Sequence, residues 1–298
     1  VAPGQPREIT LSVVGTNDVH GAIAATDESG GLVAISAYVD ALRRARAADG
    51  GAVLLIDAGD MWQGTLESNL VEGAAVVDAY NAMGVTAAAI GNHEFDFGPE
   101  GPNAIPLEDD EDPRGNLKQR AREAAFPLLA ANLIDDTSGA PVAWDNVRPS
   151  ILIEAAGIKV GIVGVMTSNA LTTTIAANTP NLSIAPLAET INAQARQLRD
   201  DGAALIIVAA HAGGKCTDFL DRLDLSSCDM SAEIMRVANH LEPGLVDHII
   251  GGHKHNPMAH VVNGMPVTSN YANAFSFGRV DFRIDAATQR VVSRQVFA

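Results

Sequence analysis

Residues 9–21 read ITLSVVGTNDVHG, an apolar segment followed directly by a polar one. Residues 9–14 are mostly β-branched and aliphatic, which is typical of a buried strand. The polar part contains Asp18 and His20, whose carboxylate and imidazole groups can bind a cation. We therefore expect a strand that ends in a turn carrying metal-binding side chains.

The same arrangement recurs along the chain. Further apolar runs with the length of buried strands lie at 53–56, 87–90, 205–209 and 248–250. The polar segments that directly follow them are DAGD at 57–60, GNHEFD at 91–96, HAGG at 211–214 and GGHKH at 251–255. In α/β sheets the carboxyl ends of the strands open onto a crevice where ligands bind, so we expect these segments to converge.

Segments with helical character separate the predicted strands, at 32–48, 74–83 and 187–199. Alternating strands and helices predict a layered α/β fold. The β-rich stretches 150–166 and 265–284 each predict an antiparallel hairpin, which requires mixed rather than purely parallel sheets. Prolines and the acidic run EDDED at 108–112 predict a solvated loop over residues 99–114.

Composition restricts the functional class. The 298 residues contain 20 Lys and Arg against 36 Asp and Glu, a formal net charge of −16. This acidity disfavours binding to a nucleic-acid polymer. The sequence also lacks an apolar run of the roughly 18 residues that a membrane span needs. We expect one domain over residues 1–298 that acts on a small molecule, and the sequence carries no signal for an oligomeric state.

Two further features point to an exported protein. Cys216 and Cys228 lie in a polar, loop-like stretch, and a disulfide between them is favoured over two free thiols. The N-terminal residues 1–6 read VAPGQP, which resembles the remainder left after removal of a signal peptide. We therefore expect a periplasmic or extracellular location.

The polar segments supply ligands for more than one cation. Asp60 offers a carboxylate able to bridge two ions, and Asn92 offers an amide oxygen. The remaining candidates are imidazoles, at His211, His253 and His255. Mixed nitrogen and oxygen ligands predict two divalent cations, with Mn or Zn favoured and Fe, Co, Mg or Ca as alternatives. Two such ions can share a hydroxide and clamp phosphoryl oxygens, which predicts hydrolysis of a phosphate ester by a metal-bound hydroxide.

His93 has a different predicted role, because Asp96 follows it by three residues and can orient its ring. We assign it to protonating the leaving oxygen. Each motif alone has a plain structural alternative: a polar surface pair, a tight turn, or the start of a helix at Asn92. The conjunction of all five segments favours function. Residues predicted to be structural, supporting or superficial are Asp57, Trp62, Glu94, Lys215, His240, His248 and His260.

Together the five segments resemble the metallophosphoesterase (calcineurin-like) N-terminal domain of the 5′-nucleotidase family, in the family's order and over nearly the whole chain. The resemblance implies a four-layer αββα sandwich with two central mixed β-sheets. It also implies that one ion is held by Asp18, His20, Asp60 and His255, and the other by Asp60, Asn92, His211 and His253. His93 and Asp96 would form the catalytic dyad.

Two departures bear on the substrate. Members of the nucleotidase family often carry Gln or Asn where this chain has His255, and they usually have a C-terminal domain that stacks the base, which we expect to be absent here. The resemblance predicts hydrolysis of phosphomonoesters, with nucleotides as the favoured substrate. The alternatives are a 2′,3′-cyclic nucleotide phosphodiesterase or general phosphodiesterase, a thiosulfohydrolase-like enzyme, and a metal-dependent binding module without turnover.

Overall fold

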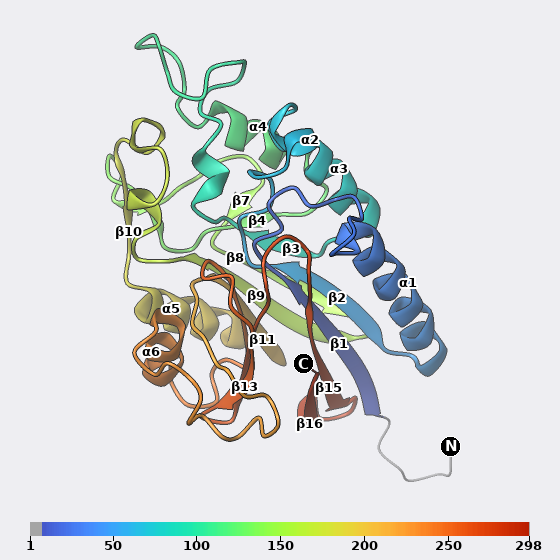
Figure 1. Cartoon of the computed structure of the whole chain (residues 1–298). Coiled ribbons are helices and arrows are strands. Elements are labelled where there is room, and N and C mark those ends of the chain that lie inside the picture. Colours follow the sequence, from blue (N-terminus) through green and yellow to red (C-terminus); the bar gives the residue numbers. More distant parts are fainter. Residues whose placement is uncertain (1–7, 298) are drawn as a thin grey trace.

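The computed structural model describes residues 8–297, so the N-terminal stretch 1–6 lies outside the described residues. Two large mixed sheets form its centre (Figure 1). The first sheet has seven strands in the order β16-β15-β1-β2-β3-β4-β7. Its members are β1 (Glu8–Thr16), β2 (Ala52–Asp57), β3 (Ala87–Ala89), β4 (Leu128–Leu129), β7 (Val147–Arg148), β15 (Gly278–Asp285) and β16 (Arg290–Phe297).

The second sheet has six strands in the order β13-β14-β12-β11-β9-β8. Its members are β8 (Ser150–Ala155), β9 (Ile158–Met166), β11 (Leu205–His211), β12 (His248–Gly251), β13 (Met258–Val262) and β14 (Met265–Ser269). In the six-stranded sheet the central strands run parallel, and the antiparallel strands β8 and β13 lie at the two edges. In the seven-stranded sheet β1, β2, β3, β4 and β7 run parallel, and antiparallel pairing is confined to the edge formed by β15 and β16. A small third sheet, which the sequence did not predict, contains β5 (Leu133–Asp135), β6 (Ala140–Pro141) and β10 (Leu182–Ile184).

Helices cover the outer face of each sheet (Figure 1). The first sheet is covered by α1 (Gly31–Asp49), α3 (Ala74–Met83) and α4 (Gly115–Glu123), with the short α2 (Leu66–Asn69) beside α3. The second is covered by α5 (Leu187–Asp200) and α6 (Glu233–His240). Short 3₁₀ helices are η1 (His93–Phe95), η2 (Ala170–Thr172) and η3 (Ala176–Asn178). The predicted four-layer sandwich is confirmed, as are the three predicted helices.

The inner faces of the two sheets pack against each other in one hydrophobic core. Leu11 and Val13 of β1 share this core with Ile207 of β11, and all three are fully buried. Val14, the next residue of β1, faces the helices instead. This alternation follows from the two-residue period of a strand, and each such side chain contributes about 1.5–3 kcal/mol when fully buried. The two sheets are therefore fixed relative to each other just below the ends of their parallel strands.

One of the two predicted hairpins is wrong. Residues 150–166 form the antiparallel pair β8–β9 as expected. Residues 265–284 do not pair with each other, because β14 belongs to the six-stranded sheet and β15 to the seven-stranded sheet. The turn-rich segment between them carries the chain from one sheet to the other. Period-two patterning identifies strands but not their partners, which explains the error.

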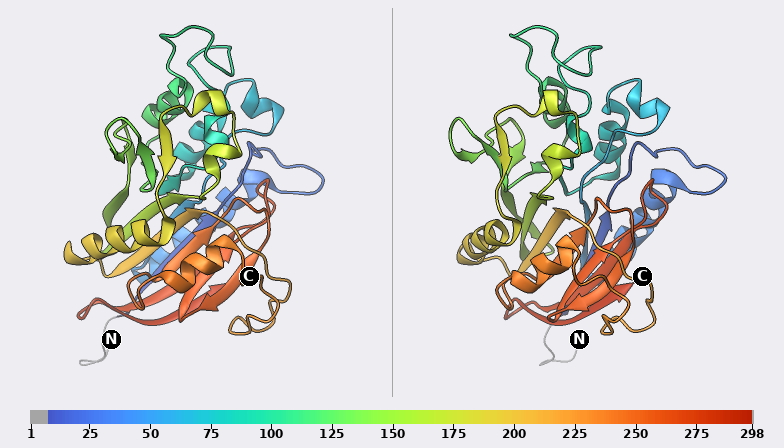
Figure 2. Two further views of the ribbon diagram at one scale, coloured as in Figure 1. Left: turned by 90° about the vertical axis from the view of Figure 1, so that its left-hand side faces the viewer. Right: turned by 60° about the vertical axis from the view of Figure 1, so that its left-hand side comes forward.

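Other predicted features agree with the structure. Residues 99–114 contain neither helix nor strand, and this loop projects from one end of the molecule (Figure 2). Cys216 and Cys228 form a disulfide in the segment between β11 and α6. Among residues 8–297, the structure contains no helix with the length and apolar character that crossing a membrane requires.

Candidate metal centre

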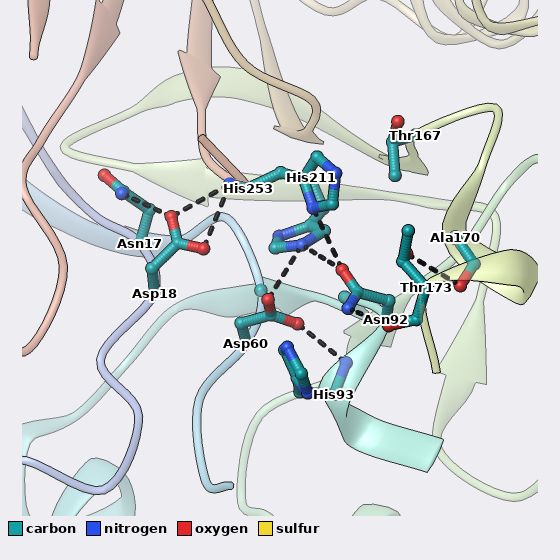
Figure 3. Close-up of polar contacts among 12 residues, drawn as sticks. Asn17, Asp18, Asp60, Asn92, His93, Thr167, Ala170, Thr173, His211 and His253 are labelled. Carbon is teal, nitrogen blue, oxygen red and sulfur yellow. Dashed lines mark hydrogen bonds and ion pairs between the residues drawn. The ribbon is translucent and has the colours of Figure 1, made fainter. Parts of the chain in front are cut away.

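The five polar segments meet at the carboxyl ends of the parallel strands, between the two sheets (Figure 3). Three of them follow strands of the seven-stranded sheet, and two follow strands of the six-stranded sheet. Hydrogen bonds join the segments directly. The backbone N–H of Asp18 donates to the carbonyl of Gly59 at 2.9 Å, and that of His253 donates to the Asp18 carboxylate at 2.9 and 3.0 Å. The site therefore exists only when both sheets are assembled.

One cluster, which we call the inner group, consists of Asp60, His211 and His253 together with Asn92. The ligand-capable atoms of its Asp and His residues all lie within 4.8 Å of one another. Nε2 of His211 lies 3.1 Å from Oδ2 of Asp60. Oδ1 of Asn92 lies 3.0 Å from both His211 Nε2 and His253 Nδ1. Ligands about 2.0–2.2 Å from one ion lie about 3 Å apart when they subtend a right angle, so the spacing fits a cation.

A second cluster, the outer group, consists of Asp18, His20 and His255. Their ligand-capable atoms also lie within 4.8 Å of one another. Nε2 of His255 lies 3.2 Å from Nε2 of His20 and 3.4 Å from Oδ1 of Asp18. The two clusters together contain the seven predicted ligands. Asp60, which the family resemblance assigns to both ions, lies with the inner residues.

Backbone carbonyls determine which ring nitrogen faces the site. Nδ1 of His211 donates to the carbonyl of Ala58 at 2.8 Å, and Nδ1 of His20 donates to the carbonyl of Gln63 at 2.7 Å. A carbonyl oxygen only accepts hydrogen bonds, so each Nδ1 carries the proton. The lone pair on Nε2 of His20 is consequently available to a cation, and in His211 it is Nε2, facing Asp60, that would release its proton to one.

The electrostatics of the inner group favour positive charge. Burial opposes charge on both Asp60 and His211, but their mutual attraction outweighs it. The pKa of His211 is therefore raised to about 10 and that of Asp60 is lowered. Burial lowers the pKa of His253 to about 4 and also lowers that of His20, so both rings are neutral near pH 7. Neutral imidazoles are the forms that bind a metal ion, so a cation bound beside Asp60 would displace the proton that His211 carries near pH 7.

The backbone of the site is strained. Left-handed φ angles between 49° and 72° occur at Asp18, His20, Asp60, His253 and His255. Such conformations cost about 1–3 kcal/mol each in residues other than glycine, and they persist where the surroundings enforce them. Their concentration at five of the seven predicted ligands indicates a site selected for function rather than for stability.

Two glycines allow the segments to approach closely. A Cβ atom on Gly91 would lie 2.2 Å from Oδ1 of Asp60. Gly59 has a φ of +93°, and a Cβ atom there would lie 2.9 Å from Nδ1 of His211. Any side chain at these positions would displace Asp60 or His211, which explains glycine beside both predicted ligands.

Glu94 supports the site through the backbone of two of its segments, whereas the sequence left open whether it was a supporting or a surface residue. Its buried carboxylate accepts hydrogen bonds from the backbone N–H groups of Asp60 (2.9 Å), Met61 (2.7 Å) and Gly91 (2.6 Å). Burial raises the pKa of Glu94 to about 8. Glu94 thereby joins the segment that carries Asp60 to the segment that carries Asn92.

His93 and Asp96 form the predicted pair. Nδ1 of His93 lies 2.5 Å from Oδ2 of Asp96, and this hydrogen bond raises the pKa of His93 to about 8. The His93 backbone N–H donates to Oδ1 of Asp60 at 2.9 Å, and its ring centroid lies 5.4 Å from that of His20. His93 therefore stands beside both groups, with its side chain 32% exposed to solvent.

Sequence reasoning missed residues that orient the site from outside the five segments. The hydroxyl of Thr174 donates to Asp96 at 2.7 Å, and the carbonyl of Thr173 accepts from Nδ2 of Asn92 at 2.9 Å. The second contact directs Oδ1 of Asn92 toward the histidines. Asn270 donates its backbone N–H to Asn17 at 2.9 Å. No local motif marks these residues, because only the fold brings them to the site.

The histidines predicted to be structural lie elsewhere. His248 is buried and bonds to the Thr268 hydroxyl at 3.0 Å. Nε2 of His260 donates to the carbonyl of Asp218 at 2.9 Å. Trp62 is 1% exposed and packs in the core, as predicted.

Comparison with known proteins agrees with this geometry. The sequence model of the calcineurin-like phosphoesterases matches residues 11–257, and the chain belongs to this family. It is 30% identical over 216 residues to a 5′-nucleotidase from Diplobatis ommata, covering 70% of the chain and 34% of that protein. It is 27% identical over 317 residues to the protein UshA from Yersinia enterocolitica, covering 99% of the chain and 53% of that protein.

Among solved structures, the calcineurin-like phosphoesterase YfkN from Bacillus subtilis superimposes with a TM-score of 0.73. It shares 19% sequence identity, covering 97% of the chain and 90% of that structure, and this likeness concerns the fold alone. Phosphoesterases of this family use two divalent metal ions. The chain spans between a third and about half of the length of the two curated relatives.

Proposed function

We propose that the protein hydrolyses phosphomonoesters, with nucleoside 5′-monophosphates as the favoured substrates. The observation that carries this proposal is the position of His93, hydrogen-bonded to Asp96 and adjacent to both ligand groups. A protonated imidazole at the edge of a cation site is suited to a leaving group that departs as an alkoxide.

The residues present fit two divalent ions. Oxygen and nitrogen donors with spacings near 3 Å suit Mn or Zn, and also accept Fe, Co, Mg or Ca. One ion would be held by Asp18, His20, Asp60 and His255, and the other by Asp60, Asn92, His211 and His253. Such ions activate water and neutralise charge on the phosphoryl oxygens.

The protein's own groups perform the proton transfer. Near pH 7 the raised pKa of His93 keeps its ring protonated, so Nε2 can donate to the leaving oxygen. Asp96 holds the ring through Nδ1, and Thr174 in turn holds Asp96. These contacts fix the direction of the donated proton, and none of the three residues is itself a proposed metal ligand.

The test is a comparison of the parent with His93→Ala on p-nitrophenyl phosphate in the presence of Mn²⁺. We expect kcat to fall by about 10²- to 10⁴-fold, the usual contribution of a general acid, while bound metal is unchanged. The matched control is His240→Ala on α6, an exposed histidine that belongs to neither ligand group. If His93→Ala were as fast as the parent, His93 would not be the general acid of the reaction.

A substrate panel separates monoesterase from the other candidate activities. The substrates are AMP, bis-p-nitrophenyl phosphate and 2′,3′-cyclic AMP, each with added Mn²⁺. The proposal predicts the highest kcat/KM for AMP. Preference for either diester would favour a phosphodiesterase, and metal binding without turnover of any substrate would favour a binding module.

We also propose that the protein functions in an oxidising compartment outside the cytoplasm. The support is the Cys216–Cys228 disulfide, since disulfides persist mainly in exported proteins. Alkylation of denatured, unreduced protein isolated from its native source should label neither cysteine.

A further inference from the structure

A cavity of about 750 Å³ adjoins the outer group. His255 forms part of its wall, and the other side chains that matter here are Thr65, Glu28, Tyr271 and Phe275. Nε2 of His255 also lies 3.4 Å from Oδ1 of Asp18, so His255 belongs both to the outer group and to the cavity wall. A substrate whose phosphate lies at the metal centre would extend its leaving group into this space.

Two exposed aromatic rings form one wall of the cavity. Tyr271 is 47% exposed and Phe275 is 58% exposed, in a protein with only 4% aromatic residues. Their ring centroids lie 5.8 Å apart with planes at 86°, an edge-to-face arrangement. The two rings therefore present an angled apolar surface rather than packing into the core. Large apolar side chains exposed beside a polar site are typical of a ligand-binding surface.

The loop that carries these rings, residues 270–277, is fixed to the metal centre. The backbone N–H of Asn273 donates to the carbonyl of Asp18 at 2.8 Å. Asn270 exchanges hydrogen bonds with Asn17, the residue before Asp18, at 2.9 and 3.1 Å. The loop also contacts the segment between β1 and α1, where the Ser29 hydroxyl donates to the carbonyl of Ala274 at 3.1 Å. The rings thus keep a defined position relative to the metal centre.

The charge of the cavity restricts its ligand. Its lining includes the exposed carboxylate of Glu28, and neither Lys nor Arg is among its lining residues. A second phosphate group would be repelled there, whereas hydroxyl or amino groups could donate hydrogen bonds to Glu28. An uncharged aromatic group that carries polar substituents matches both the rings and the carboxylate.

We propose that this cavity binds the nucleoside moiety of a nucleoside 5′-monophosphate, with the base stacked against Tyr271 and Phe275. The inference rests on the proposed function and names the subsite that would select its substrate. Base recognition would then be provided by the same domain that holds the metal ions.

The first experiment compares AMP with ribose 5-phosphate, which carries the same phosphomonoester without the base. The double variant Tyr271→Ala/Phe275→Ala should lower the preference for AMP, measured as the ratio of the two kcat/KM values, by about 5- to 150-fold, as stacking on aromatic side chains predicts. Tyr271→Phe keeps the aromatic ring and should largely retain the preference for AMP. Leu223→Ala removes an exposed apolar side chain outside the cavity and should leave the ratio unchanged.

The second experiment measures binding of adenosine by saturation-transfer NMR, without any turnover. The parent should bind adenosine, and the double variant should bind it at least about fivefold more weakly. Equal adenosine binding by both proteins, or an unchanged substrate ratio, would overturn the subsite. If the parent hydrolyses neither ester, the proposed function fails, and the adenosine measurement still decides whether the subsite exists. Thermal unfolding of each variant verifies that the fold is retained.

Discussion

The inner and outer groups of the metal centre contain similar side chains in different surroundings. In the inner group the side chain of His211 is fully buried, and Asp60 is 2% exposed. In the outer group the side chain of His255 is 49% exposed and lines the cavity. A backbone carbonyl orients one histidine in each group, but Glu94 supports only the inner group, and the outer group opens toward solvent at His255. The difference suggests that one half of the centre provides rigidity and the other admits the substrate.

The largest effect is expected where the two groups join, at Asp60. Asp60→Asn keeps the shape of the side chain but removes the negative charge that both ions would share. We expect the variant to lose most bound metal and at least about 10³-fold in kcat, because the nucleophile and the phosphate clamp depend on both ions. Metal content and activity on p-nitrophenyl phosphate measure this. If the variant retained two ions and full activity, Asp60 would not be a ligand that the metal centre requires.

The next largest effect is a loss of stability, which the variants His211→Ala and His255→Ala compare between the two groups. Removing His211 leaves the carboxylate of Asp60 buried without its partner, which costs about 3–5 kcal/mol in the free energy of unfolding. Removing the half-exposed His255 should cost about 1 kcal/mol or less. Urea denaturation in the presence of a chelator measures both without metal binding. Equal losses for the two variants would mean that the groups do not differ in rigidity.

A smaller effect on stability is expected for Glu94, which supports the inner group. Glu94→Gln replaces one acceptor oxygen with a donor that faces backbone N–H groups already in place. The variant should be less stable by about 1–3 kcal/mol, the cost of an unsatisfied buried polar group. The same denaturation assay applies, with the exposed Glu67→Gln on α2 as the control. Unchanged stability would show that Glu94 does not hold the loops together.

The smallest effect concerns a buried histidine outside the centre. Burial lowers the pKa of His248 from 6.5 to about 3, so below pH 6.5 the unfolded chain binds a proton that the folded protein excludes. Stability contributed by this group is present above pH 6.5 and is lost as pH falls toward 3, by at most about 1.4 kcal/mol per pH unit. His248→Gln should flatten the decline of unfolding free energy between pH 6.5 and 5. Identical slopes for parent and variant would contradict this.

Much of the architecture was predictable because strands and helices leave periodic patterns. Segment 9–14 and its equivalents proved to be parallel strands, and their polar continuations met as expected. The 265–284 hairpin failed because alternation does not encode which sheet a strand joins. The same limitation hid Asn270, whose role arises only because its loop crosses between the sheets.

The candidate ligands could be chosen from residue type and position, and the family resemblance implied their division between two ions, but the difference in burial between the two groups could not be predicted. Burial of His211 and exposure of His255 depend on which loops cover them, and spacing in the sequence does not report this. The left-handed backbone at Asp18 and Asp60 was equally invisible, since neither residue type requires it. Nor did the sequence indicate that Tyr271 and Phe275 would lie beside the centre.

The central claim is that the two groups bind two divalent cations that the reaction requires. The most direct measurement is a titration of chelator-treated protein with Mn²⁺, following bound metal and phosphatase activity in the same samples. The account predicts two ions per chain, with the inner site filling first and activity appearing only as the second ion binds. Full activity in protein that contains no divalent metal would contradict it.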